Sequence, residues 1–543
     1  MLEGVSVIAQ CLPFSQIPHT TPLFADYLSS SSKVMTFYSR PPKFRTWLHD
    51  EAKTVAYEPG RRARVAAVLE RQNHAWGASS RTLANVEKLR AGALAAVSGQ
   101  QVGLFGGPLM GLLKVLTAVK LAEDATAGGL SVVPVFWLAS EDHDLAEVDH
   151  VSFLGGDHRL QKVTAETQVS PGAPVGTIEF GASTSALVEQ ISALVGGGEV
   201  AEFLKLSYQP GETLAGAFAK LYTRLFADFG VIFLDPADPE LHAVAEPLFH
   251  SAIERAPELN DALLTRSKAL TAAGYHEQVK VTSSSSLLFT LRDGARVPIH
   301  RLNRSTDRFE VAGEEISQQD LLRRISDKPA DFSPNALFRP VVQDFLLPTL
   351  VYSGGPAETA YLAQSAVVYE RLLGRITPLF PRFSATLVEG KAANLLARYG
   401  LAVADTFAGE DALRETLAKK ALPVRLQAVF QTAQAAITQQ VRELTTALTQ
   451  LDPTLTDSAE RAGRKMSYQV ERLKARAGRA ELRRSEVLAR HAAVLSAALY
   501  PHKGLAEREI AGVHYLGRYG LDLLRGIYEH IHLDCLDHQI LWV

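Results

Sequence analysis

Cysteine is nearly absent from this chain, whose 543 residues include only Cys11 and Cys535. Two cysteines so far apart in sequence argue against a disulfide framework and fit a protein of the reducing cytoplasm. Long apolar runs are lacking as well, since no stretch of about 18 apolar residues occurs, and we expect no membrane span. The N-terminus has no basic stretch followed by an apolar core, so we also expect no signal peptide.

The chain also lacks an excess of one charge: it has 56 lysines and arginines and 59 aspartates and glutamates, which gives a net charge of −3. This balance argues against a nucleic-acid partner, although it leaves a local basic patch open. What the chain does have is length and a hydrophobic content of 47%, enough for large cores in two to four domains. We therefore expect a cytoplasmic α/β protein with a helical appendage, without a membrane or nucleic-acid partner.

A glycine-rich segment, residues 98–109, follows an apolar run and leads directly into a helical pattern. Pro108 suits the first turn of that helix, where its missing N–H costs nothing. Gly103, Gly106 and Gly107 would let backbone N–H groups approach a ligand, and the start of a helix favours an anion such as phosphate. A purely structural turn is the alternative interpretation of the same glycines.

Polar side chains accompany this glycine segment. Gln100 and Gln101 can donate and accept hydrogen bonds without carrying charge, which suits a neutral or zwitterionic ligand. Lys114 lies about two turns into the expected helix 108–124, and helical side chains lean toward the N-terminus, so its ammonium would reach a bound phosphate. The alternative is a solvated lysine.

A second segment, residues 134–144, is a β-branched and aromatic strand that ends in four ionisable side chains: Glu141, Asp142, His143 and Asp144. Ligands of open α/β sheets bind at the carboxyl ends of strands. Three interpretations stay open. The cluster is a solvated loop, a set of acid/base and amine-binding groups, or, if the segment is helical, a metal site formed by His143, Glu147 and His150.

A third segment repeats this arrangement at another predicted strand end. Gly355 and Pro356 begin a helix, and Glu358 near its third position either caps that helix or contacts a ligand. Tyr361 and Gln364 follow at three-residue steps and would extend a ribbon of ligand-facing side chains.

Two further groups have open interpretations. Arg339 and Asp344 lie in otherwise apolar sequence and form either an internal salt bridge or a site in which Arg339 recognises a carboxylate or phosphate. A group near the C-terminus has the spacing of metal ligands, but a surface helix end followed by a terminal strand is the alternative: His530, His532, Cys535 and His538.

The order of predicted elements indicates a parallel sheet. Strand, glycine segment, helix and strand 132–138 form one βαβ unit, and helix 211–228 with strand 231–235 forms another. The sheet resumes after a short helix that follows Pro340, with strand 349–353, helix 357–372 and strand 385–388. A hairpin with an Asp293-Gly294 turn is expected within an insertion. The expected division is an N-terminal segment 1–90, core 91–150, insertion 151–210, core 211–274, insertion 275–330, core 331–410, coiled coil 411–498 and C-terminal segment 499–543.

The hydrophobic period changes in the region 411–498. Apolar residues alternate steps of three and four on each side of Asp452-Pro453, which predicts an antiparallel helical hairpin with a heptad seam on each arm. The predicted seam residues are Leu426, Phe430, Ala433, Ile437, Val441, Leu444, Leu448, Leu451, then Met466, Val470, Leu473, Ala477, Ala480, Val487 and Val494. Arg484 interrupts the second arm. Such hairpins often need a partner surface, so we expect a homodimer.

Several of these stretches together carry a family resemblance. The runs 98–114, 134–144, 338–364 and 381–389, followed by a coiled coil, resemble the bacillithiol biosynthesis cysteine-adding enzymes, a family of cysteine ligases. The resemblance implies a Rossmann-like parallel sheet core with connecting-peptide insertions, similar to class I aminoacyl-tRNA synthetases, plus an α-helical coiled-coil domain that promotes dimerisation. It also implies the addition of cysteine to glucosaminyl-malate, with ATP and Mg²⁺ as the expected cofactors.

The resemblance also implies site roles. The first glycine segment and its helix would stabilise phosphate charge, the cluster Glu141 to Asp144 would bind amines and take a proton, and the segment of Gly355 with Tyr361 would position the sugar substrate. The histidine motif of class I synthetases is absent, and Gly106-Gly107-Pro108 stands in its place. A nucleotidyltransferase or adenylating enzyme for another small acid, and a non-catalytic coiled-coil scaffold, are the alternative functions.

Overall fold

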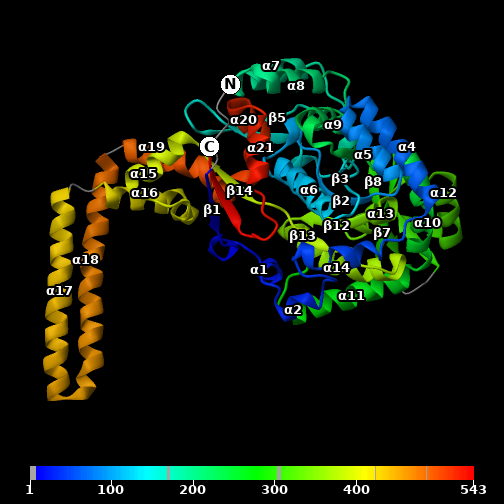
Figure 1. Ribbon diagram of the computed structural model, residues 1–543. Coiled ribbons are helices and arrows are strands. Elements are labelled where there is room, and N and C mark those ends of the chain that lie inside the picture. Colours follow the sequence, from blue (N-terminus) through cyan, green and yellow to red (C-terminus); the bar gives the residue numbers. More distant parts are fainter. Residues whose placement is uncertain (1–7, 168–170, 303–306, 422–423, 485) are drawn as a thin grey trace. The chain divides into compact units, whose positions relative to one another are not determined.

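The computed structural model describes residues 8–167, 171–302, 307–421, 424–484 and 486–543 (Figure 1). Contacts divide the chain into two compact units, each made of separate stretches of sequence. The first unit comprises Met1–Phe153, Gln161–Thr386 and Glu507–Leu541, and the second comprises Leu154–Leu160, Leu387–Ala506 and Trp542–Val543.

A parallel five-stranded sheet forms the centre of the first unit. Its order is β13–β12–β2–β3–β6, and all four neighbouring pairs are parallel, which confirms the expected Rossmann-like core. The strands are β2 (Leu94–Gln100), β3 (Val132–Leu138), β6 (Ile232–Leu234), β12 (Thr349–Gly354) and β13 (Leu379–Pro381). All seven residues of β3 are buried, as befits a strand covered on both faces of a parallel sheet.

Helices pack on this sheet and around it. Ala95 and Val97 of β2 share a core cluster with Val65 and Val86 of the preceding helices, whereas the helix after β2 contacts β2, β3 and β12. The helices of this unit are α1 (Pro22–Leu28), α2 (Ser32–Met35), α3 (Leu48–Ala52), α4 (Pro59–Ala75), α5 (Ser80–Arg90), α6 (Met110–Ala127), α7 (Thr184–Leu194), α8 (Gly198–Ser207), α9 (Leu214–Leu225), α10 (Pro239–Glu254), α11 (Ala256–Ala272), α12 (Gln318–Asp327), α13 (Arg339–Leu346), α14 (Pro356–Leu373), α20 (Gly512–Tyr519) and α21 (Asp522–Glu529).

The connection between β2 and α6 differs from the expectation. Pro108 is not in the first turn of the helix, because α6 begins at Met110 and Pro108 instead forms an isolated bridge with Ala511. The next residue, Leu109, donates its N–H to the carbonyl oxygen of Ile510 at 2.9 Å. Pairing with the C-terminal part of the chain therefore holds this proline outside the helix, an interaction that no local pattern reveals.

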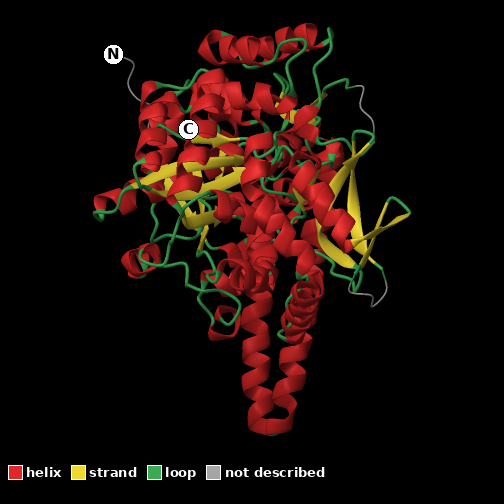
Figure 2. Ribbon diagram, turned by 90° about the vertical axis from the view of Figure 1, so that its right-hand side faces the viewer, coloured by secondary structure: helices red, strands yellow, loops and turns green. Residues whose placement is uncertain are grey.

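A second, antiparallel sheet has the order β10–β9–β8–β7–β11 and contains the expected hairpin. Arg292 pairs with Ala295 across the turn, where Asp293 and Gly294 both have positive φ, as a two-residue hairpin turn requires. The strands are β7 (Ser285–Arg292), β8 (Ala295–Arg301), β9 (Arg308–Val311), β10 (Glu314–Ser317) and β11 (Phe332–Pro334). Figure 2 shows this twisted sheet as the group of long strands at the right.

The expected core strand 385–388 belongs to another sheet. As β14 (Ala385–Val388) it lies in a three-stranded sheet of order β1–β15–β14, with β1 (Ile8–Leu12) and β15 (His538–Trp542). The edge of the central sheet is taken by β13, which pairs with β12 through Tyr352 and Leu379. Three residues ending in proline give too short a pattern to be recognised as a strand. The remaining strands are β4 (His150–Leu154) and β5 (Leu160–Thr164), which form a two-stranded sheet.

The second unit is helical and contains the expected antiparallel hairpin. Figure 2 shows its two long helices side by side, joined by a short turn at Asp452-Pro453. The helices are α15 (Gly390–Tyr399), α16 (Glu410–Lys420), α17 (Val424–Leu451), α18 (Thr456–Arg484) and α19 (Glu486–Leu499). None of the described helices in either unit combines the length and the apolar character needed to cross a bilayer.

The heptad seams of both helices are only partly as expected. In α17, Leu444 and Leu451 are 55% and 79% exposed, so their assignment to the seam is wrong. Val470 is half-buried as predicted, but Met466 and Leu473 are 43% and 56% exposed, so their assignment to the seam is wrong. Gly463 is buried instead, and a Cβ there would lie 2.5 Å from Cγ1 of Val441. The two helices approach closely at this glycine, which a search for apolar residues overlooks. The side chain of Arg484 lies outside the described part of the chain.

Replacing Gly463 by leucine should weaken the α17–α18 hairpin by roughly 1–3 kcal/mol, because the new side chain overlaps Val441. Hydrogen exchange of the amides of α17 and α18 measures the effect, and we expect faster exchange than in the native chain. Ala462→Leu is the matched control, since Ala462 is exposed on the same helix. Equal protection in both variants would contradict the close approach at Gly463.

Candidate functional site

A cavity of about 670 Å³ lies in the first unit at the carboxyl ends of the central strands. Gln100 at the end of β2, Trp137 in β3 and Tyr352 in β12 contribute to one wall. Phe289 and Arg296, from the β7–β8 hairpin, also line the cavity. This is the edge at which open parallel sheets bind ligands.

The ammonium of Lys114 lies at this edge in an ion pair. Lys114 is only 2% exposed, and its Nζ donates to the carbonyl oxygen of Gly99 at 2.9 Å and to Oε1 of Gln100 at 2.7 Å. Its third partner is the carboxylate of Glu358. Lys114 is therefore not the solvated lysine considered as an alternative, and its charge is already matched by a carboxylate.

Glu358 combines this ion pair with a role in starting α14. Its Oε2 accepts the N–H of Gly355 at 3.2 Å, so the expected capping function is present. Burial would raise the pKa of Glu358, but the charge of Lys114 and its hydrogen bond prevail and hold that pKa at about 2. Burial lowers the pKa of Lys114, and Glu358 counteracts this shift. The pair therefore joins two charged groups, one from each of α6 and α14.

A cluster of carboxylates is organised by Gln101. The side-chain amide of Gln101 donates to Oδ2 of Asp142 at 2.9 Å and to Oε2 of Glu147 at 2.5 Å. Asp142 also accepts the backbone N–H of His143 at 2.7 Å. Gln101, Asp142, His143 and Glu147 all contribute to the cavity lining, whereas Asp144 is exposed and outside it. The cluster gives this wall an excess of negative charge.

The helical metal site considered for this segment is not formed. Only Leu145–Glu147 makes a single 3₁₀ turn, and His150 already begins strand β4, so His143, Glu147 and His150 do not share a helical face. Nδ1 of His150 lies 2.8 Å from a carboxylate oxygen of Asp149. In the described part of the chain, no group of three or more His, Cys, Asp or Glu side chains is arranged to hold a metal ion.

Glu141 has a buried partner that the sequence did not reveal. Its Oε1 lies 2.9 Å from Nε2 of His242, a nearly buried residue of α10. Burial opposes protonation of His242, but the hydrogen bond and charge of Glu141 prevail and raise its pKa above the ordinary value. A lone histidine in an apolar helix carries no pattern that links it to residue 141. The pair places a hydrogen-bonded imidazole and carboxylate beside the cavity, whose lining includes Glu141.

Arg339 contributes an unmatched positive charge to the lining. Its Nη2 donates to the hydroxyl of Tyr361 at 2.8 Å, and its Nη1 to Oε1 of Gln343 at 3.2 Å. The expected alternative, a salt bridge with Asp344, does not form, because Asp344 instead accepts a hydrogen bond from Tyr369 at 2.8 Å. Among the described residues, no carboxylate lies within ion-pair distance of Arg339.

Two more cavity arginines were not predicted. Arg296 of β8 lies over the ring of Phe289 at 4.0 Å, donates from Nε to Oγ of Ser333 at 2.8 Å, and has its Nη1 3.2 Å from Nδ1 of His143. Arg508 contacts Sδ of Met110 at 3.7 Å. Both lack a carboxylate within ion-pair distance in the part of the chain that the structure describes. They come from an insertion and from the C-terminal part of the chain, which no local motif connects with the sheet.

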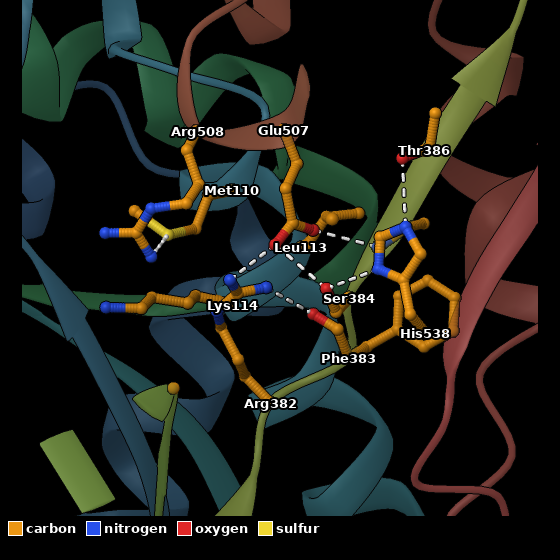
Figure 3. A network of polar contacts seen from close by, with 12 residues as sticks. Met110, Leu113, Lys114, Arg382, Phe383, Ser384, Thr386, Glu507, Arg508 and His538 are labelled. Atoms are coloured by element: carbon orange, nitrogen blue, oxygen red, sulfur yellow. Dashed lines mark hydrogen bonds and ion pairs between the residues drawn. The ribbon is translucent and has the colours of Figure 1, made fainter. Parts of the chain in front are cut away.

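A buried ion pair lies next to Arg508 in the chain (Figure 3). Glu507 is fully buried, and its Oε1 lies 2.5 Å from Nη2 of Arg382. Its Oε2 also accepts the backbone N–H of Ala385 at 2.8 Å. Burial would raise the pKa of Glu507, but Arg382 prevails and lowers it. These contacts fix the backbone from which Arg508 extends beside Met110, in the same direction as Lys114.

His538 belongs to this buried network rather than to a metal site. Its Nδ1 lies 2.7 Å from Oγ of Ser384 and its Nε2 lies 2.9 Å from Oγ1 of Thr386. Burial lowers the pKa of His538 to about 4, so the imidazole is neutral at pH 7. Cys535, another member of the predicted group, contacts Cys11 instead. His538 and Cys535 therefore have different partners and do not share a metal site, although their spacing in the sequence resembles that of metal ligands.

Gly103, Gly106 and Gly107, the glycines predicted to approach a ligand, are not among the residues of the cavity lining. Gly103 donates its N–H to the carbonyl oxygen of Gln101, and Gly107 donates to that of Leu104. The N–H of Gly106 lies 3.0 Å from the hydroxyl of Tyr208 and 3.1 Å from a carbonyl oxygen. These N–H groups are already hydrogen-bonded within the protein, so they are not available to bind a phosphate.

Two predicted residues of the third segment also lie apart from the cavity lining. Gly355 is used in the capping of α14, as described above. Gln364 is fully buried, and its Oε1 accepts the backbone N–H groups of Gln278 and Val279. Tyr361 alone of the Tyr361–Gln364 pair reaches the cavity. Gln364 supports the cavity only indirectly, because it holds the backbone of Val279, which is a lining residue.

Comparison with known proteins finds two family descriptions that together span nearly the whole chain. Residues 8–383 match the bacillithiol biosynthesis BshC N-terminal Rossmann-like domain, and residues 385–543 match the BshC C-terminal coiled-coil domain. The similar curated proteins carry the name "Putative cysteine ligase BshC". The one from Koribacter versatilis is 51% identical over 99% of this chain and 100% of its own length. Those from Solibacter usitatus and Salinibacter ruber are 38% and 34% identical, each over 98% of this chain and at least 99% of their own.

Glu358→Gln should destabilise the protein at pH 7 by about 3–5 kcal/mol, because it leaves the Lys114 ammonium buried without a counter-charge. The folded-state pKa of Glu358, about 2, lies below its ordinary value, so its stabilising effect is present above pH 4.5 and is lost as the pH falls toward 2. Urea unfolding at several pH values checks both statements. The double variant Lys114→Met/Glu358→Gln is the control and should recover much of the loss; no recovery would contradict the charged pair.

Proposed function

Because the chain belongs to the bacillithiol biosynthesis BshC family, we propose that it is a cysteine ligase that forms an amide between the carboxylate of cysteine and the amine of glucosaminyl-malate. This reaction would be the last step of bacillithiol synthesis. The observation that carries the proposal is the division of charge in the cavity, with a carboxylate cluster at Gln101 and three arginines without carboxylate partners among the described residues. The two proposed substrates offer both an ammonium and carboxylates.

The carboxylate cluster suits the amines of the reaction. Asp142 and Glu147, held by Gln101, would bind the ammonium of cysteine. The attacking amine of glucosaminyl-malate has to be free of its extra proton. Arginine can only donate, so Nδ1 of His143 would accept from Nη1 of Arg296, 3.2 Å away, and Nε2 would carry the ring proton. His143 would thus donate to a substrate oxygen, and the proton of the amine would pass to Glu141.

The arginines suit the malate part of the acceptor. A malate group carries two carboxylates, and a guanidinium can bind a carboxylate through two parallel hydrogen bonds. Arg339 is held by Tyr361 and lies about 6 Å from the ring of Trp137, so it is positioned before a ligand arrives. Tyr361 also lies in the cavity lining and would offer an aromatic surface on which a sugar ring packs.

Amide formation needs an activated carboxylate, because an ionised carboxylate has no good leaving group. We propose ATP, with Mg²⁺, as the source of activation, most simply as an adenylate. The N–H groups of Gly103, Gly106 and Gly107 are bonded within the protein, but Met110, the first residue of α6, lies in the cavity lining next to Arg508. The start of a long helix beside an arginine fits phosphate groups.

We further propose that two copies associate through the α17–α18 hairpin, in the cytoplasm. Large apolar side chains are exposed on both helices at seven-residue spacing, Leu444 with Leu451 and Met466 with Leu473. Exposed apolar residues at heptad spacing favour pairing with another helical surface.

Substitutions in the carboxylate cluster and at the arginines should affect the KM values of different substrates. With cysteine, glucosaminyl-malate, ATP and Mg²⁺, product detected by mass spectrometry should form. Asp142→Asn should raise the KM for cysteine, and Arg339→Gln the KM for glucosaminyl-malate, each by roughly tenfold to a hundredfold, because a charged hydrogen bond is lost. Arg323→Gln, on the exposed surface of α12, is the control and should change neither value. Folded protein that binds ATP but forms no product, or forms product from another acid alone, would overturn this assignment.

Placing negative charges on the exposed apolar side chains of the α17–α18 hairpin tests whether it forms a dimer. Leu444→Glu combined with Leu473→Glu should shift the sedimentation coefficient from that of a dimer to that of a monomer, because charged side chains would be buried between copies. Gln450→Glu adds one negative charge at an exposed polar position of α17 and should leave the dimer intact. A native chain that sediments as a monomer at micromolar concentration would contradict the proposal.

A further inference from the structure

The two cysteines of the chain meet in space although 524 positions separate them in sequence. Sγ of Cys11 lies 3.3 Å from Sγ of Cys535, and both residues belong to the first unit. Cys11 is in β1 and Cys535 precedes β15, and these strands are neighbours in the three-stranded sheet. Backbone pairing between the strands therefore holds the two thiols side by side.

A buried amide is directed at both sulfur atoms. Nε2 of Gln539 lies 3.3 Å from Sγ of Cys11 and 3.1 Å from Sγ of Cys535, and Gln539 is only 4% exposed. Its backbone N–H donates to the carbonyl oxygen of Ser384 at 2.9 Å, which fixes the residue in β15. An amide N–H beside a sulfur stabilises the thiolate, the form that reacts with disulfides.

The two thiols differ in access to solvent. Cys11 is exposed, whereas Cys535 is half-buried. Burial raises the pKa of the Cys535 thiol, which favours Cys11 as the first to react. A disulfide has an S–S distance of about 2.0 Å, so the sulfur atoms need to approach by only about 1.3 Å from their present 3.3 Å.

We propose that Cys11 and Cys535 form a thiol–disulfide exchange site that reacts with low-molecular-weight disulfides. In the first step the Cys11 thiolate attacks a disulfide RSSR, which gives a Cys11–S–S–R mixed disulfide and releases one RS⁻. In the second step Cys535 loses its proton to solvent and attacks the Cys11 sulfur, which forms the Cys11–Cys535 bond and releases a second RS⁻. The protein loses two electrons and two protons, and RSSR is reduced to two thiols.

The cross-link would tie β1 covalently to the C-terminal segment Glu507–Leu541, which also carries Arg508 of the cavity lining. Reduction by a dithiol reverses both steps, so the tie is reversible. The proposal concerns thiol chemistry at a separate place in the first unit and does not depend on the ligase activity.

The test uses the purified full-length protein and oxidised glutathione as the probe. After incubation and removal of the probe, intact mass should show the loss of two hydrogens, no free thiol on alkylation, and recovery of both thiols after dithiothreitol. Cys11→Ser and Cys535→Ser should each give at most a mixed disulfide with glutathione, because the partner thiol is missing. Mixed disulfides alone in the native chain, a covalent dimer, or no reaction would each overturn the proposal.

A further variant tests the role of Gln539. Gln539→Leu removes the donor to both sulfurs and should slow formation of the internal disulfide by roughly tenfold, while both thiols remain countable by alkylation after unfolding. Gln450→Leu, an exposed position of α17, is the matched control and should react at the native rate. Unchanged kinetics in Gln539→Leu would show that the amide has no part in the exchange.

Discussion

The buried ion pair of Lys114 and Glu358 is the constraint on which the cavity depends. Lys114 comes from α6 and Glu358 from α14, the helices that follow β2 and β12, two adjacent strands of the central sheet. Two charges taken out of water are costly unless every donor and acceptor is used. Here Gly99, Gln100 and the N–H of Gly355 complete the set. The same contacts orient Gln100 and the start of α14, so one electrostatic requirement shapes two strand ends at once.

The remaining charges of the cavity are arranged by sign. Carboxylates gather where Gln101 meets Asp142 and Glu147, and guanidinium groups come from α13, the β7–β8 hairpin and the C-terminal segment. Arg296 and His143 form the contact between these two sets. A cavity organised in this way orients molecules that carry both an ammonium and carboxylates, because either end bound at the wrong wall would meet a like charge.

The sequence predicted the parallel sheet, the hairpin at Asp293-Gly294 and the antiparallel helices, because each depends on a local period or turn. It also placed Lys114 and Asp142 near neighbouring strand ends, which converge in a parallel sheet, and both lie in the cavity lining. For Arg339, another lining residue, the sequence left a salt bridge with Asp344 as an open alternative. It could not indicate His242, Arg296 or Arg508, whose approach depends on long-range packing. The heptad pattern misplaced Met466 because a glycine, which no search for apolar residues selects, fixed the contact of the two helices.

The segment Glu507–Leu541 returns to the first unit after the chain has passed through the coiled coil. It supplies Ala511 beside Pro108, Glu507 beside Arg382 and Arg508 in the cavity lining. During synthesis the five strands of the central sheet leave the ribosome long before this segment does. The nascent chain therefore holds a sheet whose binding edge is incomplete, with the guanidinium of Arg382 lacking its buried carboxylate, until more than a hundred further residues have been translated. Completion of the cavity is thus a late event in the life of each new molecule.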